Sequence, residues 1–254
     1  AEPLFVRALT IFEKVLGREH PDVAISLNNL AHFYELRGNY GKAEPLYLRA
    51  LAILEKVVGR EHPYVTNSLN NLAALYSLQG NYGKAEPLYL RALAIREKVL
   101  GREHPDVAAS LNNLAAIYSL QGNDGKAEPL YLRALAIREK VLGRENSDVA
   151  TSLNDLASLY QSQRNYDKAE PLYLRALAIR EKVLDREHPD VANNLNDLAS
   201  LYWEKGDVTR STDFYTRGLA VEEKNLQLIY AVGSEQRKQN YAQTFTGSTT
   251  GVVS

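Results

Sequence analysis

The chain has 254 residues, of which 45% are hydrophobic and 24% charged, and its formal net charge is -1. This composition is typical of a globular protein, and the balanced charge argues against a nucleic-acid binder that acts by neutralising phosphates. No apolar run approaches the roughly 20 residues of a membrane span, and the start lacks the pattern of a secretory signal, so we expect no membrane partner. Cysteine is absent, which excludes disulfides and thiolate metal sites and is typical of a cytoplasmic protein.

A 42-residue repeat organises the sequence. The Ala-Glu-Pro triplet returns with this spacing, and its prolines are Pro3, Pro45, Pro87, Pro129 and Pro171. A His-Pro pair keeps the same period at 20–21, 62–63, 104–105 and 188–189, and Asn146-Ser147 replaces it once. The pattern predicts a partial unit at residues 1–20 and further units that start near residues 21, 63, 105, 147 and 189. Since methionine is absent and the sequence opens inside a repeat, we expect a segment of a longer protein.

The first half of each unit is expected to be an amphipathic helix. In the segment from Pro105 to Gly122, apolar residues recur at spacings of three and four, as in Leu111, Leu114 and Tyr118. Proline suits the opening turn, because its missing N–H would be unpaired there. The glycine that closes each segment can adopt the left-handed conformation that ends a helix; these glycines are Gly38, Gly80, Gly122 and Gly206.

The second half of each unit is expected to be a longer helix, from Tyr82 to about Leu100 in one copy. Its apolar side includes the small residues Ala85 and Ala92, which allow close approach to the first helix. Pro87 is expected to distort the first turn mildly. A single helical hairpin leaves its apolar face exposed, whereas stacked hairpins bury it in a continuous core. The sequence therefore predicts an all-α solenoid.

These residues resemble a known family. The set Leu72, Ala73, Tyr76, Gly80, Tyr82, Ala85, Tyr89 and Ala92 resembles the tetratricopeptide repeat (TPR) pattern. The period exceeds the usual 34 residues of that family, and the extra eight residues, in the string "REKVLGRE", resemble the repeats of kinesin light chains. The resemblance implies a right-handed α-α superhelical solenoid of helix hairpins over residues 1–232. It also implies a protein-protein interaction scaffold without catalysis.

The last unit and the tail depart from the pattern. Ser211 and Gly218 replace the alanines of the other units, as expected of a degenerate capping repeat. Residues 233–254 are expected to form a short helix and a flexible tail. This stretch resembles the connector that precedes a CHAT (caspase-like) protease domain in bacterial TPR proteins. The alternative function is therefore a regulatory or sensor arm of a larger signalling protein with such a fused effector.

The candidate partner-binding residues lie on the first helices, which line the concave groove of a TPR solenoid. They are Asn28, Asn29, Asn67, Asn70, Asn71, Asn112, Asn113, Asn154, Asp155, Asn193, Asn196, Asp197, Trp203 and Glu204. An amide side chain both donates and accepts, so a series of asparagines can pair with the backbone of an extended peptide. Alternatively, the asparagine pairs bind only the neighbouring helices and keep the repeats in register.

The charge of these positions indicates the kind of partner. None of them is basic, which disfavours the lysine and arginine clamp by which some TPR domains bind a terminal carboxylate. Asp155, Asp197, Glu204 and Glu35 make the groove mildly acidic, and Trp203 offers an apolar anchor. We expect a neutral to basic peptide whose binding weakens with salt.

Catalytic, cofactor and metal sites are not expected. The four histidines of the His-Pro pairs lie one repeat apart, too far for a shared zinc ion, and are expected to cap the following helices. Glycine-rich phosphate loops, G-x-S-x-G and H-E-x-x-H are absent. The carboxylates of "REKVLGRE" are expected to form solvated pairs along their own helix. A purely structural spacer is a third possibility.

Overall fold

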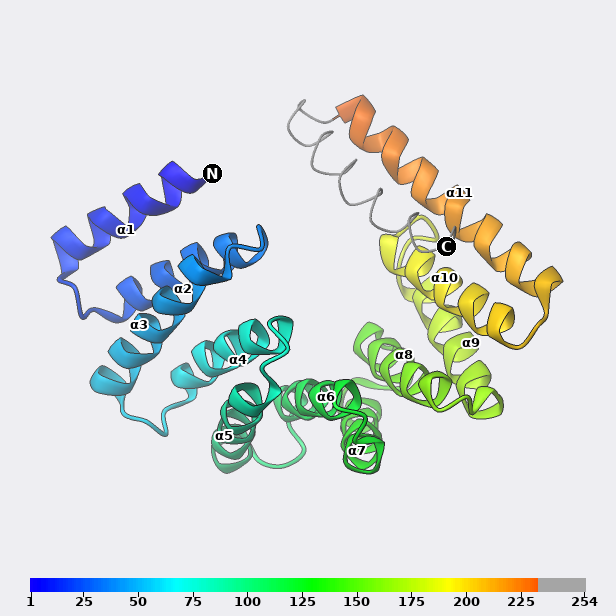
Figure 1. Cartoon of the computed structure of the whole chain (residues 1–254), viewed down its shortest axis with the longest axis horizontal. Helices are drawn as coiled ribbons and strands as arrows, with labels where there is room; N and C mark the ends of the chain where they lie inside the picture. Colours follow the sequence, from blue (N-terminus) through cyan, green and yellow to red (C-terminus); the bar gives the residue numbers. More distant parts are fainter. Residues whose placement is uncertain (233–254) are drawn as a thin grey trace. The chain divides into compact units, whose positions relative to one another are not determined.

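The computed structural model describes residues 1–232, which form eleven α-helices joined by short loops and contain no β-strand in that range (Figure 1). The all-α class predicted from the sequence is confirmed. The chain divides into two compact units, unit 1 (Ala1–Val141) and unit 2 (Leu142–Ser254). The short helix and tail predicted at 233–254 lie outside the described residues.

Unit 1 and unit 2 each consist of several 42-residue repeats. Each repeat is a helical hairpin in which a first helix packs on a longer second helix. In unit 1 the first helices are α2 (Pro21–Glu35), α4 (Pro63–Leu78) and α6 (Pro105–Leu120). The second helices are α1 (Glu2–Leu16), which belongs to the partial repeat, α3 (Tyr40–Val58), α5 (Tyr82–Leu100) and α7 (Asp124–Leu142). Unit 2 contains the first helices α8 (Ser147–Ser162) and α10 (Pro189–Glu204) and the second helices α9 (Tyr166–Val183) and α11 (Val208–Val232).

The histidines of the His-Pro pairs cap the first helices, as predicted. Nδ1 of His62 accepts a hydrogen bond from the backbone N–H of Tyr64 at 3.2 Å, and His104 caps α6 in the same way. Asn146 does the same with its side-chain oxygen, which accepts from the N–H of Asp148 at 2.8 Å. Asparagine can replace histidine at this position because both offer one acceptor to an otherwise unpaired N–H.

The ends of the first helices need a left-handed residue. Gly38, Gly80, Gly122 and Gly206 have φ between 68° and 80°, as predicted. The equivalent position in α8 is occupied by Arg164, which has φ 56°. A residue with a Cβ is strained there by about 1 kcal/mol, so this repeat keeps the turn at a cost.

Small residues let the two helices of a hairpin approach closely. Ala73 of α4 and Ala85 and Ala92 of α5 are completely buried, and Leu69 and Leu72 fill the space beside them. Each buried leucine contributes about 1.5–3 kcal/mol before chain entropy is subtracted. Pro87 lies inside α5 near its start and leaves the helix intact. The hairpins therefore present their remaining polar side chains at fixed positions.

Candidate functional site

Unit 1 contains three pairs of adjacent asparagines, and the first member of each pair is turned toward the interior of the fold. The pairs are Asn28-Asn29, Asn70-Asn71 and Asn112-Asn113. In unit 1, Nδ2 of Asn28 on α2 donates to Oγ of Ser68 on α4 at 2.8 Å. The amide of Asn70 is oriented so that its oxygen accepts from both terminal nitrogens of Arg96 at 3.2 Å. Asn112 on α6 is buried. Asn28 and Asn70 thus link a first helix to its neighbours, which is the second of the two alternatives left open by the sequence.

Arg96 is a residue that sequence reasoning missed. It extends from second helix α5 and donates to Oδ1 of Asn67 on α4 at 3.2 Å and to Oγ of Ser110 on α6 at 2.8 Å. A further bond reaches the backbone oxygen of Asp106 at 3.2 Å. Burial lowers the pKa of the guanidinium, and the charge of Asp106 opposes this shift. A basic side chain therefore enters the joint between two first helices, although the first helices themselves place no basic residue there.

A sequence signal for this arginine existed. The equivalent residue in the 42-residue period is Leu54 in the first joint, Arg96 in the next and Glu222 in the last. Because apolar, cationic and anionic residues alternate at this position, its side chain is expected to contact different groups in different repeats. Where the arginine is present, it takes up an amide oxygen of the first helix; where Leu54 stands, Asn28 bonds to Ser68 instead.

Unit 2 contains a longer chain of hydrogen bonds at the corresponding joint. Arg180 of α9 donates to Oδ1 of Asn194 on α10, Asn194 donates to Oδ1 of Asn154 on α8, and Asn154 donates to Asp197 at 2.9 Å. Burial raises the pKa of Asp197, opposed by the hydrogen bond from Asn154 and the charge of Arg180. Asp197, predicted to contact a partner, is thus mostly occupied within the fold.

Glu204 also has internal partners. Nε2 of Gln161 on α8 donates to Oε1 of Glu204 at 2.7 Å and to Oγ of Ser200 at 3.2 Å, and the hydroxyl of Tyr173 donates to Oε1 of Gln161 at 3.0 Å. Burial, together with the charge of Asp197, raises the pKa of Tyr173. Glu204 is nevertheless exposed, so its carboxylate contributes negative charge to the surface of unit 2.

Asn196 lies at the contact between α10 and α11, the last two described helices. Its Nδ2 donates to Oε1 of Glu222 on α11 at 3.0 Å. A Cβ added to Gly218 would lie 2.5 Å from Oδ1 of Asn196, so the glycine makes room for this amide. Ser211, the other departure in the last unit, is buried and donates to the backbone oxygen of Ala199 at 2.8 Å. Both departures therefore have a packing reason.

The second asparagine of each pair behaves differently. Asn29 and Asn113 are exposed and Asn71 is half-buried, and their side chains make no hydrogen bond within the described part of unit 1. The surface formed by α2, α4 and α6, which follow one another in Figure 1, thus presents amides that are open to an outside partner. We call it the first-helix face. In unit 2, exposed Asn193 and Trp203, which is 66% exposed, occupy the surface of α10.

Tyrosines near the ends of the first helices also connect consecutive hairpins. A tyrosine near the end of each first helix donates its hydroxyl to a glutamate of the preceding second helix: Tyr34 to Glu2 (2.7 Å), Tyr76 to Glu44 (2.9 Å) and Tyr118 to Glu86 (2.7 Å). A lysine lies over each ring, about one repeat apart, namely Lys42, Lys84 and Lys126. Burial and the hydrogen bond to Glu86 raise the pKa of Tyr118 to about 12.

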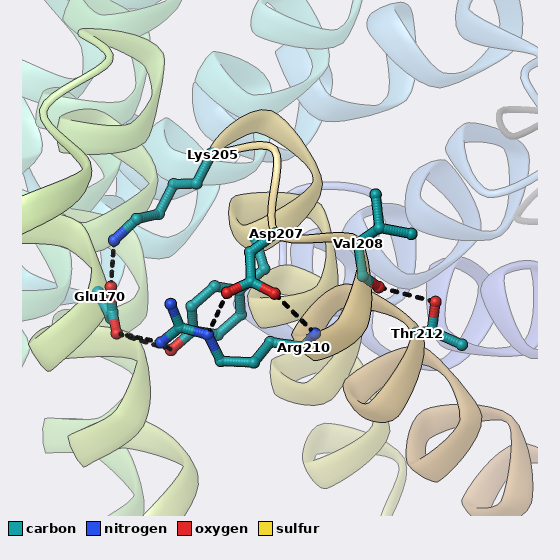
Figure 2. Close-up of polar contacts among 7 residues, drawn as sticks. Glu170, Lys205, Asp207, Val208, Arg210 and Thr212 are labelled. Atoms are coloured by element: carbon teal, nitrogen blue, oxygen red, sulfur yellow. Dashed lines mark hydrogen bonds and ion pairs between the residues drawn. The ribbon is translucent and has the colours of Figure 1, made fainter.

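Figure 2 shows the variant of this arrangement at the start of α11. Lys205 and Arg210 both point to the carboxylate of Glu170, and Arg210 is held by Asp207, whose Oδ2 accepts from Nε at 2.6 Å. Tyr202 donates to Glu170 at 2.7 Å. Burial of Glu170 acts to raise its pKa, but the hydrogen bonds from Lys205 and Tyr202 outweigh it, so the pKa is lowered.

The carboxylates of "REKVLGRE" were expected to form solvated pairs along their own helix; a long pair of this kind joins Glu97 to Arg102 at 3.9 Å, but the shorter pairs reach the next repeat. Glu97 of α5 pairs with Arg133 of α7 at 2.6 Å. Glu103, in the loop after α5, pairs with Lys140 of α7 at 2.6 Å. The pairs join consecutive repeats, because the second helices lie side by side and bring residues about one repeat apart into contact.

The side-chain groups and the helices of residues 1–232 were compared with the requirements of a metal site and of a membrane span. That range holds no cluster of three or more His, Cys, Asp or Glu side chains suited to a metal ion. Among the described helices, none combines the length and apolar character required to cross a bilayer.

Comparison with known proteins gives a consistent result. The sequence profile of the tetratricopeptide repeat matches residues 1–56, 22–98, 64–140 and 148–224. The crystal structure of BtubC (BKLC) from P. vanneervenii is 26% identical, with a TM-score of 0.73, over 88% of this chain and 90% of that one. A putative kinesin light chain of Podosopora anserina with nearly identical TPR-like repeats is 30% identical, with a TM-score of 0.66, over 81% of this chain and 98% of that chain.

More distant structures share the fold alone. The apo form of RapI is 19% identical, with a TM-score of 0.59, over 87% of this chain and 92% of that one. A comparison with curated proteins found no match.

Proposed function

Because this chain belongs to the tetratricopeptide repeat family, with kinesin light chain-like repeats, we propose that it binds a protein partner in the concave groove, on its first-helix face. TPR repeats form a scaffold that is typical of protein-protein interaction, and the chain is proposed to have no catalytic activity of its own and to act in the cytoplasm. The observation that carries the proposal is the pair of exposed amides Asn29 and Asn113, with half-buried Asn71 between them in sequence.

The second asparagines suit a peptide backbone. Each presents both a donor and an acceptor, and none is engaged within the described part of unit 1, so a partner need not displace an internal bond. The first asparagines are less suitable, since Asn28 and Asn70 would lose their bonds to Ser68 and Arg96. We therefore narrow the predicted partner-binding set in unit 1 to the second asparagines.

The charge of unit 2 favours a neutral to basic partner. Exposed Glu204 and exposed Trp203, which offers a large apolar surface, lie in the last turn of α10. Asp155 is half-buried on α8. An exposed aromatic ring and an exposed carboxylate on one helix suit a basic peptide, in which a lysine or arginine stem can pack on the ring while basic groups meet the negative charge.

Trp203 provides the assay because it is the single tryptophan of the chain. A peptide array, sorted by net charge, supplies hits, and the best hit is titrated while tryptophan emission is recorded at low and high salt. We expect neutral or basic hits, a blue shift of emission and weaker binding in salt. A preference for acidic peptides would contradict the proposed charge, and Trp203→Phe serves as the control without signal.

The alternative of a sensor arm fused to a CHAT protease rests on the resemblance of residues 233–254, which lie outside the described range. It stays a prediction, and the sequence of the full-length gene tests it directly.

A further inference from the structure

A row of exposed arginines follows the loops of unit 1, away from the asparagine pairs. Arg18, Arg60 and Arg102 occur in the repeated string Gly-Arg-Glu that follows α1, α3 and α5. Their side chains are 76%, 75% and 76% exposed. We call these three residues the arginine row.

The arginine row is only loosely paired. The Nε atoms lie 3.9, 3.7 and 3.9 Å from the nearest carboxylate oxygens, and no other side-chain contact of these arginines is found within residues 1–232. The terminal nitrogens of each guanidinium therefore face solvent. Those nitrogens form the planar fork that binds a carboxylate through two parallel hydrogen bonds.

Each repeat of unit 1 carries a surplus cation at this place. Beside Arg60, the carboxylate of Glu55 pairs with Arg91 and that of Glu61 pairs with Lys98. Three cations thus share two carboxylates, and the row arginine is the one with the weakest partner. The same arrangement recurs 42 residues later around Arg102. The surface is locally positive although the whole chain has a net charge of -1.

Two hollows lie beside the row. One has a volume of about 360 Å³ and is lined by Arg60, Glu61, Arg91, Ala94, Ile95 and Lys98. The next has a volume of about 390 Å³ and is lined by the equivalent residues of the following repeat, Arg102, Glu103, Arg133, Ala136, Ile137 and Lys140. Ala94 and Ile95 give the hollow an apolar part within a charged rim. The phosphate backbone of a nucleic acid offers no apolar group to contact Ala94 and Ile95, whereas a peptide can place a small apolar side chain there.

We propose that the arginine row and its hollows bind an acidic segment of a partner protein. Carboxylates of the segment pair with Arg60 and Arg102, and a small apolar side chain between them enters each hollow. The partner is opposite in charge to the ligand of the first-helix face, so this inference does not rest on the proposed function. It gives the scaffold a second surface for a different class of partner.

The experiment uses the full chain and a dye-labelled peptide in which pairs of Asp or Glu alternate with single valines. Binding is measured by fluorescence anisotropy at low salt for the wild type and for the triple variant Arg18→Ala, Arg60→Ala, Arg102→Ala. The control, Lys42→Ala, Lys84→Ala, Lys126→Ala, removes the same charge from the same unit at another level of the joints. We expect the arginine variant to bind about tenfold more weakly and the lysine variant to bind within about twofold of the wild type.

Four further outcomes decide the proposal. Equal losses in both triple variants would show a diffuse charge effect and overturn it, as would no binding by the wild type. Replacing the valines of the peptide by serine should weaken binding, because the hollows then lose their apolar contact. If single-stranded DNA of equal charge binds as tightly as the peptide, and with the same loss in the arginine variant, the site is a general polyanion site and the proposal is wrong. Thermal unfolding of both variants, recorded in parallel, verifies that they remain folded.

Discussion

Arg96→Ala tests the joint between consecutive hairpins. The guanidinium of Arg96 bonds to Asn67 and Asn70 on α4 and to Ser110 and the backbone of Asp106 on α6. Alanine removes all of these bonds while it leaves the hairpin cores untouched. Since α4 and α5 form one hairpin and α6 begins the next, the substitution removes bonds within a hairpin as well as bonds to the following one.

The magnitude follows from which acceptors lose their partner. Asn67 is exposed and water replaces the arginine there, whereas the oxygen of half-buried Asn70 and the buried hydroxyl of Ser110 are harder to hydrate. Two hydrogen bonds to a charged donor are worth about 3–5 kcal/mol, and removal of a half-buried charge returns about 1–2 kcal/mol. The expected loss is about 2 kcal/mol, or about 8 °C in Tm for a unit of this size.

The assay combines urea unfolding, followed by circular dichroism, with hydrogen exchange of the α4 and α6 amides. The control is Lys98→Ala, which breaks an exposed pair with Glu61 two residues further along the same helix. We expect the control to cost less than about 0.5 kcal/mol and to leave exchange unchanged, while Arg96→Ala speeds exchange at the joint. Equal effects of the two variants would refute the structural role given to Arg96.

Three further substitutions test local conclusions. Arg164→Gly should raise stability by about 1 kcal/mol, because glycine adopts positive φ without strain; an unchanged urea midpoint would refute the strain. Gly218→Ala should lower stability by about 1 kcal/mol, and adding Asn196→Ala should restore it, since the clash then disappears; additive losses would contradict this. Asp197→Asn should stabilise the chain near pH 7, because burial raises the pKa of the aspartate in the fold and its charge is costly there. That advantage should shrink as the pH falls through the raised pKa, where wild-type Asp197 takes up a proton on folding, and an advantage that grows in acid would contradict the burial effect.

The fold was predictable because the same helix signals occur in every copy of the repeat. Each 42-residue copy carries a proline at a helix start, a glycine at a helix end and apolar residues at helical spacing. Short-range patterns of this kind determine helices and hairpins with little need for distant contacts. The caps at His62 and His104 and the left-handed Gly80 are confirmed for the same reason.

The sequence did not predict which asparagine of a pair bonds within the fold and which stays open to a partner. Asn70 and Asn71 have identical side chains and adjacent positions, and only the three-dimensional position of Arg96 separates them. That arginine comes from another helix, so a pattern confined to the first helices omits it. The pairing of Glu97 with Arg133 escaped prediction likewise, because the partners are 36 residues apart and meet only when the second helices lie side by side.

The most direct test of the account compares the two members of the pairs. The Kd of the best peptide from the array is measured for the triple variant Asn29→Ala, Asn71→Ala, Asn113→Ala and for the triple variant Asn28→Ala, Asn70→Ala, Asn112→Ala. We expect the first variant to bind at least about tenfold more weakly with unchanged stability, since it loses only outside contacts, and the second to lose about 1–2 kcal/mol of stability per buried bond. Wild-type affinity in the first variant would contradict the claim that the second asparagines receive the partner.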